Sequence, residues 1–288
     1  MTRGLGRTLV VTMIIGSWVN QSLLAETRSV LAMVQQAKNH ARQGDHAMAA
    51  QILDQAKMMA PNSEEVLSDF AKNSLAAGDP VGAINTLEPL MRMHPTVADY
   101  PYYLGVALLQ VKEYQPSATA LRRSLDLEPQ RSLTLIALGI TLLSQKQFAD
   151  AKDYAARSLE IEPAAAEALA VLAEAEAGLA DLEKAEFYAN RALSLSPTHA
   201  GANFVLGRVR MSQGRFEEAK EYFLKAIEIT PSSSRIHYQL SLAYARLNDP
   251  ENSMKYRELH QQTRKENTAR VESMRKRAGL KESGMRPD

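Results

Sequence analysis

The sequence predicts an all-α protein built from tandem helical repeats. Proline recurs at a constant interval of 34 residues, at Pro61, Pro95, Pro129, Pro163, Pro197 and Pro231. Two columns of small residues follow the same period, and the alternating apolar pattern of half-buried strands is missing from the chain. A fixed period of this length is typical of a protein in which each repeat is one supersecondary unit.

The repeat boundaries follow from placing this proline at position 32 of each copy. Six full copies and an imperfect seventh then cover residues 30–63, 64–97, 98–131, 132–165, 166–199, 200–233 and 234–267. An ordinary helical bundle has no reason to space six prolines equally while two other columns stay small. Because each unit of a repeat protein packs only on its neighbours, we expect residues 26–267 to form a solenoid.

Positions 8 and 20 hold small residues in every repeat. Position 8 is Ala37, Ala71, Gly105, Gly139, Ala173, Gly207 and Ser241, and position 20 is Ala49, Ala83, Ser117, Ala151, Ala185, Ala219 and Ser253. Small side chains allow two helix axes to approach closely, and larger apolar neighbours fill the grooves between helices. Leucine dominates position 7, and position 30 is apolar from Met59 to Ile229, so we expect both columns to fill those grooves.

Turn residues divide each repeat into two helices. Gly44, Gly78 and Gly214 lie mid-repeat, where glycine tolerates the positive φ that ends many helices. The proline at position 32 lacks an N–H and disfavours the α conformation of the residue before it, so it ends the second helix. Each repeat is therefore expected to be a helix–turn–helix unit.

These columns resemble the tetratricopeptide repeat (TPR) family. Small residues at positions 8 and 20 and proline at position 32 are the family's signature, and the match covers residues 30 to about 267. The tryptophan that the family carries at position 4 is absent, and position 11 is tyrosine only at Tyr244. The resemblance implies a right-handed superhelix of about seven repeats that acts as a scaffold binding a protein or peptide.

A long capping helix is expected to follow the last repeat. Asp249 supplies an N-cap, Pro250 suits the first helical position, and no proline or glycine follows until Gly279. We therefore expect one helix from Pro250 to about Ala278, with fraying beyond it. Residues 268–288 form the basic end of this segment, which suits a weak contact with phospholipid head groups or an acidic partner. Mixed charge on a solvated capping helix is the simpler interpretation.

Residues 1–25 resemble an export signal. Arg3 and Arg7 precede an apolar stretch at residues 9–19, and a short polar stretch then leads to Ala25. The apolar stretch is shorter than the roughly 20 residues that span a membrane. Cleavage after Ala25 changes the net charge from +1 to −1, because both arginines leave. Leu23 is large for a cleavage site, so an uncleaved inner-membrane anchor at residues 9–24 is the alternative. Either form places the repeats outside the cytoplasm, as a periplasmic or secreted protein.

No pattern in the sequence predicts catalysis or a cofactor. The chain has no cysteine, its six histidines are scattered, and no phosphate-binding loop, nucleophile elbow or zinc motif occurs. The net charge of +1 argues against a nucleic-acid partner. Met91, Met93 and His94 suit Cu(I) as ligands, and a copper carrier is a low-ranked alternative. We expect Met91 and Met93 to fill core gaps instead, because later repeats carry leucine or isoleucine at these positions.

The family resemblance also implies a binding surface on the concave face. In TPR proteins this face is lined by positions 2, 5, 6, 9, 12 and 13 of successive first helices. We select the apolar and aromatic residues at these positions, together with two charged neighbours. The candidates are Tyr102, Tyr103, Val106, Leu109, Ile136, Ile140, Leu143, Val171, Glu174, Phe204, Arg208 and Tyr238. The lysine and asparagine pattern with which some members bind a C-terminal carboxylate is not matched. An extended or helical apolar segment fits better, and internal packing of these residues is the alternative.

The leading functional hypothesis is therefore a non-enzymatic interaction scaffold in a cell-envelope assembly. The assignment to the envelope rests on the signal segment and on family analogy. A structural module that associates with copies of itself through its terminal repeats is the second hypothesis.

Overall fold

The computed structural model describes residues 25–280, and these residues form helices joined by short turns, with no strand among them. The predicted signal segment up to residue 24 and the predicted frayed tail from residue 281 lie outside the described residues. The chain divides into two compact units, residues 1–95 and residues 96–288. The boundary falls at Pro95, the proline that closes the second predicted repeat.

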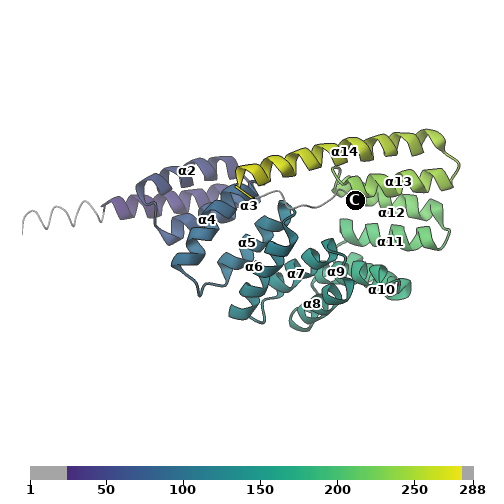
Figure 1. Cartoon of the computed structure of the whole chain (residues 1–288), viewed down its shortest axis with the longest axis horizontal. Coiled ribbons are helices and arrows are strands. Elements are labelled where there is room, and N and C mark those ends of the chain that lie inside the picture. The colour runs from purple at the N-terminus through teal and green to yellow at the C-terminus, as the bar shows by residue number, and fades with distance from the viewer. Residues whose placement is uncertain (1–24, 281–288) are drawn as a thin grey trace, which may run out of the picture. The chain divides into compact units, whose positions relative to one another are not determined.

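The helices follow the predicted repeat boundaries (Figure 1). In the first unit, residues 25–42 are helical and are followed by α2 (His46–Met59), α3 (Glu64–Ala76) and α4 (Pro80–Met93). The second unit contains α5 (Asp99–Gln110), α6 (Tyr114–Leu127), α7 (Ser132–Ser144), α8 (Phe148–Ile161), α9 (Ala166–Gly178), α10 (Leu182–Leu195), α11 (Ala200–Ser212), α12 (Phe216–Ile229), α13 (Ser234–Arg246) and α14 (Pro250–Arg277). The fold is an all-α helical-repeat superhelix, as predicted.

The small columns lie where helices pack most closely, and every residue at positions 8 and 20 of the seven repeats is buried. A Cβ atom added at Gly207 would lie 2.4 Å from the ring of Phe223, and one at Gly105 would lie 2.5 Å from Leu121. Both partners belong to the second helix of the same repeat. The glycines therefore set the spacing of the two helices, because a tightly packed core has no room for the extra atom.

Gly207→Ala should lower the free energy of unfolding by about 1–3 kcal/mol, because the new methyl group overlaps the buried Phe223 ring. Urea denaturation of the two proteins measures the difference. In the double variant Gly207→Ala/Phe223→Leu the smaller side chain should make room, so its loss should be less than the sum of the two single losses. Equal stability of Gly207→Ala and the parent protein would contradict this account of the packing.

The turn inside each repeat has one backbone geometry in all seven copies. Position 15 has a positive φ throughout: Gly44 (80°), Gly78 (74°), Lys112 (59°), Lys146 (60°), Ala180 (66°), Gly214 (75°) and Asn248 (57°). The next residue donates its N–H to a carbonyl five residues back, as Gln147 does to Leu142 at 2.9 Å. This is the Schellman arrangement that satisfies the last carbonyls of a helix. The prediction for the three glycines is confirmed, and the other four repeats adopt the same turn without glycine.

Ala180→Gly should raise the free energy of unfolding by about 0.5–1 kcal/mol. A Cβ in the left-handed region costs about 1–2 kcal/mol, and the extra freedom of glycine in the unfolded chain offsets part of the gain. Thermal and urea unfolding measure the change. Ala156→Gly, in the middle of α8, is the matched control and should lose about 0.5–1 kcal/mol. If both variants lose stability, the turn geometry is not a source of strain.

Position 30 departs from the sequence prediction. Its six side chains are exposed rather than packed in grooves: Met59 (50%), Met93 (44%), Leu127 (37%), Ile161 (43%), Leu195 (48%) and Ile229 (41%). Position 30 is the last residue of each second helix, so the adjoining turn leaves part of the side chain in solvent. The prediction that Met93 fills a core gap is therefore wrong, whereas the leucines of position 7 are buried as expected.

The long helix after the last repeat is confirmed. It begins after Asp249, whose carboxylate accepts the N–H of Asn252 at 3.0 Å, and it ends at Arg277, two residues before Gly279 with its φ of 67°. Its first half packs on α13, where the rings of Tyr256 and Tyr244 stack with centroids 5.4 Å apart. Among residues 25–280 no helix is long and apolar enough to cross a membrane.

Candidate functional site

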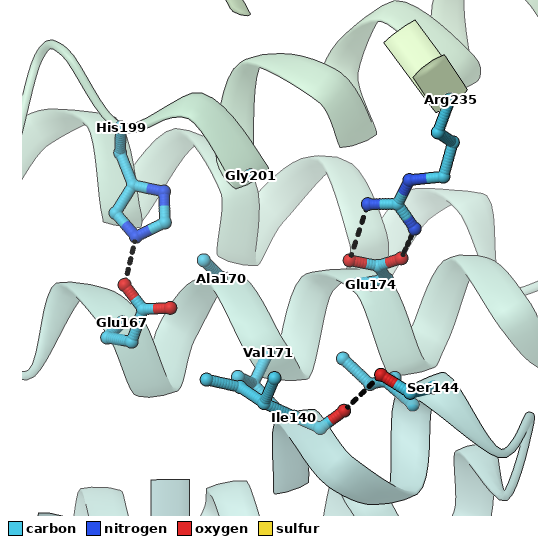
Figure 2. A pocket seen from close by; sticks show the side chains of 10 residues that line it. Ile140, Ser144, Glu167, Ala170, Val171, Glu174, His199, Gly201 and Arg235 are labelled. Atoms are coloured by element: carbon cyan, nitrogen blue, oxygen red, sulfur yellow. Dashed lines mark hydrogen bonds and ion pairs between the residues drawn. The ribbon is translucent and has the colours of Figure 1, made fainter. Parts of the chain in front are cut away.

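A pocket of about 270 Å³ opens on the second unit, where the first helices of four successive repeats lie side by side. Figure 2 shows its walls, which come from α7, α9, the start of α11 and the start of α13. The lining residues are Ile140, Leu143, Ser144, Glu167, Ala170, Val171, Glu174, His199, Gly201 and Arg235. The pocket therefore lies along the row of first helices that the family resemblance implies for binding.

The floor of the pocket is apolar. Ile140 and Leu143 are three residues apart on α7, so they share one face of that helix, and Ala170 and Val171 face them from α9. Gly201 leaves its side of the pocket open, because a Cβ there would lie 3.3 Å from Cε1 of the His199 ring. Short and branched side chains thus leave a shallow apolar depression between the helices.

An ion pair forms one end of the pocket. The guanidinium of Arg235 donates to both carboxylate oxygens of Glu174, and it lies over the ring of Phe204 with 4.1 Å between its carbon and the ring centroid. Arg208 is a second cation near the same carboxylate. Burial lowers the pKa of Arg208, while attraction to Glu174 partly opposes that effect. One carboxylate therefore balances two guanidinium groups at this end.

A histidine–carboxylate pair forms the other end (Figure 2). His199 is the N-cap of α11, and its Nδ1 accepts the N–H of Ala202 at 3.3 Å. Since Nδ1 is an acceptor, the proton of the neutral ring lies on Nε2, which donates to Glu167 at 2.9 Å. This hydrogen bond lowers the pKa of Glu167, against an opposing contribution from burial.

His199→Ala should raise the pKa of Glu167 towards its ordinary value, as carboxyl NMR titration would show. Because the folded-state pKa of Glu167 is depressed, its contribution to stability is present above the ordinary pKa and is lost as pH falls through the folded value. His199→Asn is the matched control: asparagine caps α11 as well but is too short to reach Glu167. The Asn variant should raise the pKa as much as Ala while unfolding at a higher temperature. An unchanged pKa in both variants would exclude this hydrogen bond as the cause.

The structure brings only part of the predicted groove into this pocket. Ile140, Leu143, Val171 and Glu174 line it. Ile136 (7% exposed) and Phe204 (2%) are core residues, and Phe204 packs on Phe223 with ring centroids 5.8 Å apart. For these two positions the internal-packing alternative describes what is observed. Arg208 interacts electrostatically with Glu174 but is not one of the residues that line the pocket.

The remaining predicted residues lie outside the pocket. Tyr102 and Tyr103 contact each other edge to face with centroids 5.0 Å apart, and Arg131 lies 4.7 Å above the Tyr102 ring. Val106 and Leu109 are half-buried on the same helix, α5. Tyr238 is 46% exposed and lies beside His260 of α14. These side chains extend along the row of first helices without joining one cavity.

Six lining residues were not among the sequence candidates: Ser144, Glu167, Ala170, His199, Gly201 and Arg235. Five of them occupy positions 2, 5 or 13 of their repeats, the same columns that define the concave face. Selection for apolar and aromatic character excluded them, although a groove also needs small residues that make room and polar residues that orient a ligand. His199 lies at position 34, which is not one of the columns that define the concave face. It reaches the pocket because it caps the next helix.

In the methionine–histidine cluster, His94 pairs with Glu64, with 3.3 Å between Nδ1 and the carboxylate, and Met93 is 44% exposed. Within residues 25–280 no group of three or more histidine, aspartate or glutamate side chains is arranged to hold a metal ion.

Comparison with known families agrees with this architecture. A TPR repeat model matches residues 207–248, and two tetratricopeptide repeat models match residues 69–132 and 166–199. Together with the seven copies of one helix–turn–helix geometry, these matches show that the chain belongs to the TPR family. None of the curated protein sequences is significantly similar to the chain.

Solved structures of TPR proteins resemble the fold. A tetratricopeptide repeat protein from Parabacteroides merdae has a TM-score of 0.67 at 12% identity, covering 88% of this chain and 99% of its own. PilF from Pseudomonas aeruginosa has a TM-score of 0.60 at 19% identity, covering 78% and 98%. The APC/C hetero-tetramer Cut9–Hcn1 has a TM-score of 0.65 at 18% identity over 74% of this chain, which spans 42% of the matched chain. At these identities the likeness shows the fold alone.

Proposed function

We propose that this TPR protein is a non-enzymatic scaffold whose second unit binds an extended segment of a partner protein in the pocket between α7, α9, α11 and α13. The observation that carries the proposal is the combination of an apolar floor with a carboxylate at each end, one bonded to His199 and the other paired with Arg235. TPR proteins are in general interaction scaffolds rather than catalysts.

The size and chemistry of the pocket favour a peptide over a small molecule. Its volume of about 270 Å³ falls below the roughly 300–1,000 Å³ of typical small-molecule sites. It suits one or two apolar side chains of an extended segment seated on Ile140, Leu143 and Val171. Ser144, Glu167 and Arg235 can then bond polar groups on either side of the anchor, which gives direction and specificity.

We further propose that the protein acts outside the cytoplasm, in an assembly of the cell envelope. The basic, apolar and small-residue pattern of residues 1–25 supports this location. The absence of cysteine suits either side of the membrane, so the signal segment alone carries this part of the proposal.

A photo-crosslinking amino acid at Ser144, in the pocket, should capture the partner in cells, whereas the same probe at Phe187, exposed on the second helix α10, should not. Mass spectrometry of the crosslinked species identifies the partner segment. Equal capture from both positions, or capture from neither, would contradict binding in this pocket.

Ala170→Arg should weaken binding of the captured segment about tenfold or more, because a long charged side chain fills the apolar floor. Isothermal titration with the synthetic segment measures the affinity. Ala149→Arg, on the exposed start of α8, is the matched control and should bind normally. Arg235→Ala tests the pocket without disturbing the core, since Arg235 is more than half exposed. Full affinity in both pocket variants would rule out this site.

A further inference from the structure

The C-terminal helix is much longer than its repeat requires. α14 has 28 residues, whereas α2 to α13 have 12 to 14 residues each. The amide of Asn267 donates to the carbonyl of Ser232, in the turn before α13, at 3.0 Å. The remaining ten residues continue past α13, and in Figure 1 the helix runs from beside α13 towards the end of the second unit that carries α5 and α6.

Glu113 breaks the periodicity of the repeats at the place that α14 reaches. Position 16 precedes the second helix of each repeat and holds Asp45, Asp79, Glu113, Gln147, Asp181, Arg215 and Asp249. Among these seven, Glu113 alone is buried, at 8% exposure. Asp45, Asp181 and Asp249 cap their helices, but the Glu113 side chain makes no cap hydrogen bond to α6. Its carboxylate therefore serves a contact outside its own repeat.

That contact is with the far end of α14. The guanidinium of Arg275 forms an ion pair with the Glu113 carboxylate, and the two side chains are only 18% and 10% exposed. Val271 lies one turn earlier on the same helix face and is 7% exposed. The only other buried residue of α14 is Ser253, at its beginning, where its hydroxyl donates to the Ser241 carbonyl at 2.9 Å. The helix is thus anchored at both ends, at its start to α13 and at its far end to the α5–α6 turn.

We propose that the α5–α6 turn around Glu113 is a docking site for a basic helical segment, and that the end of α14 occupies it as a releasable strap closing the second unit. Residues 268–277 carry Arg270, Arg275, Lys276 and Arg277 against Glu272 alone, and Glu113, which follows Lys112, supplies the carboxylate that pairs with one of these cations. A buried carboxylate needs such a partner, because an unpaired charge in this environment is strongly unfavourable.

The strap is built to open locally. Apart from Val271, residues 268–277 are polar, small or partly exposed, so few apolar contacts hold this end of the helix down. The anchored half of α14 lies next to the pocket: His260 donates from Nδ1 to the carbonyl of Ser234 at 2.8 Å, and Ser234 precedes Arg235 of the pocket wall. The strap itself does not depend on the pocket binding a peptide.

Distance measurement between two spin labels tests the strap in the full-length protein. The chain contains no cysteine, so Gln115→Cys on α6 and Lys276→Cys on α14 give two unique label sites that leave the ion pair intact. Pulsed EPR should show one narrow, short distance between them. Adding Arg275→Glu should abolish that population in favour of a broad, longer one. It should also speed amide exchange in residues 268–277 about tenfold or more, as expected for local opening.

Two further variants separate the strap from a general effect of charge. Arg270→Glu makes the same charge change on an exposed position of the same stretch, and it should keep the short distance. The swap Glu113→Arg/Arg275→Glu should restore the distance that Arg275→Glu loses. The proposal fails if the parent protein already shows a broad distribution, if Arg275→Glu leaves the distance unchanged, or if Arg270→Glu releases the helix equally. Circular dichroism confirms that each variant remains folded.

Discussion

Close approach of two helices within each repeat is the constraint on which the rest of the structure depends. The ring of Phe223 occupies the volume that a side chain at position 207 would need, so glycine is required there. Leu121 fills the corresponding volume beside Gly105. Because both columns, positions 8 and 20, are small in each copy, successive repeats of the second unit stack their first helices side by side. The regular row of first helices, and hence the pocket between them, is a consequence of this packing.

The turn in the middle of each repeat shows how that packing overrides local preference. Lys112, Lys146 and Ala180 adopt a left-handed conformation that favours glycine, and they do so because the two helices they join are fixed by their contacts. The cost of each strained residue is small beside the apolar surface that the helix pair buries. Local strain is therefore tolerated wherever the repeat geometry demands it.

The pocket and the strap both contain charged side chains that pair across repeats which are not adjacent in the sequence. Glu174, Arg208 and Arg235 come from three successive repeats and balance one another at one end of the pocket. Glu113 and Arg275 come from opposite ends of the second unit. Most helices contact only the helices of adjacent repeats, whereas these ion pairs connect residues far apart in the sequence. Their charges also make them sensitive to a partner that brings charges of its own.

The sequence by itself determined the repeat length, the long final helix and the columns of small residues where the two helices of each repeat pack. Each of these depends on interactions between residues near in the chain or on a column repeated seven times, so the signal accumulates along the sequence. Only the tertiary structure decided that Phe204 and Ile136 are buried while Met93 is exposed, and that Glu167, His199 and Arg235 form the ends of the pocket. It alone paired Glu113 with Arg275. These outcomes depend on the curvature of the stacked repeats, which sums small rotations at every interface and leaves no mark on any single residue.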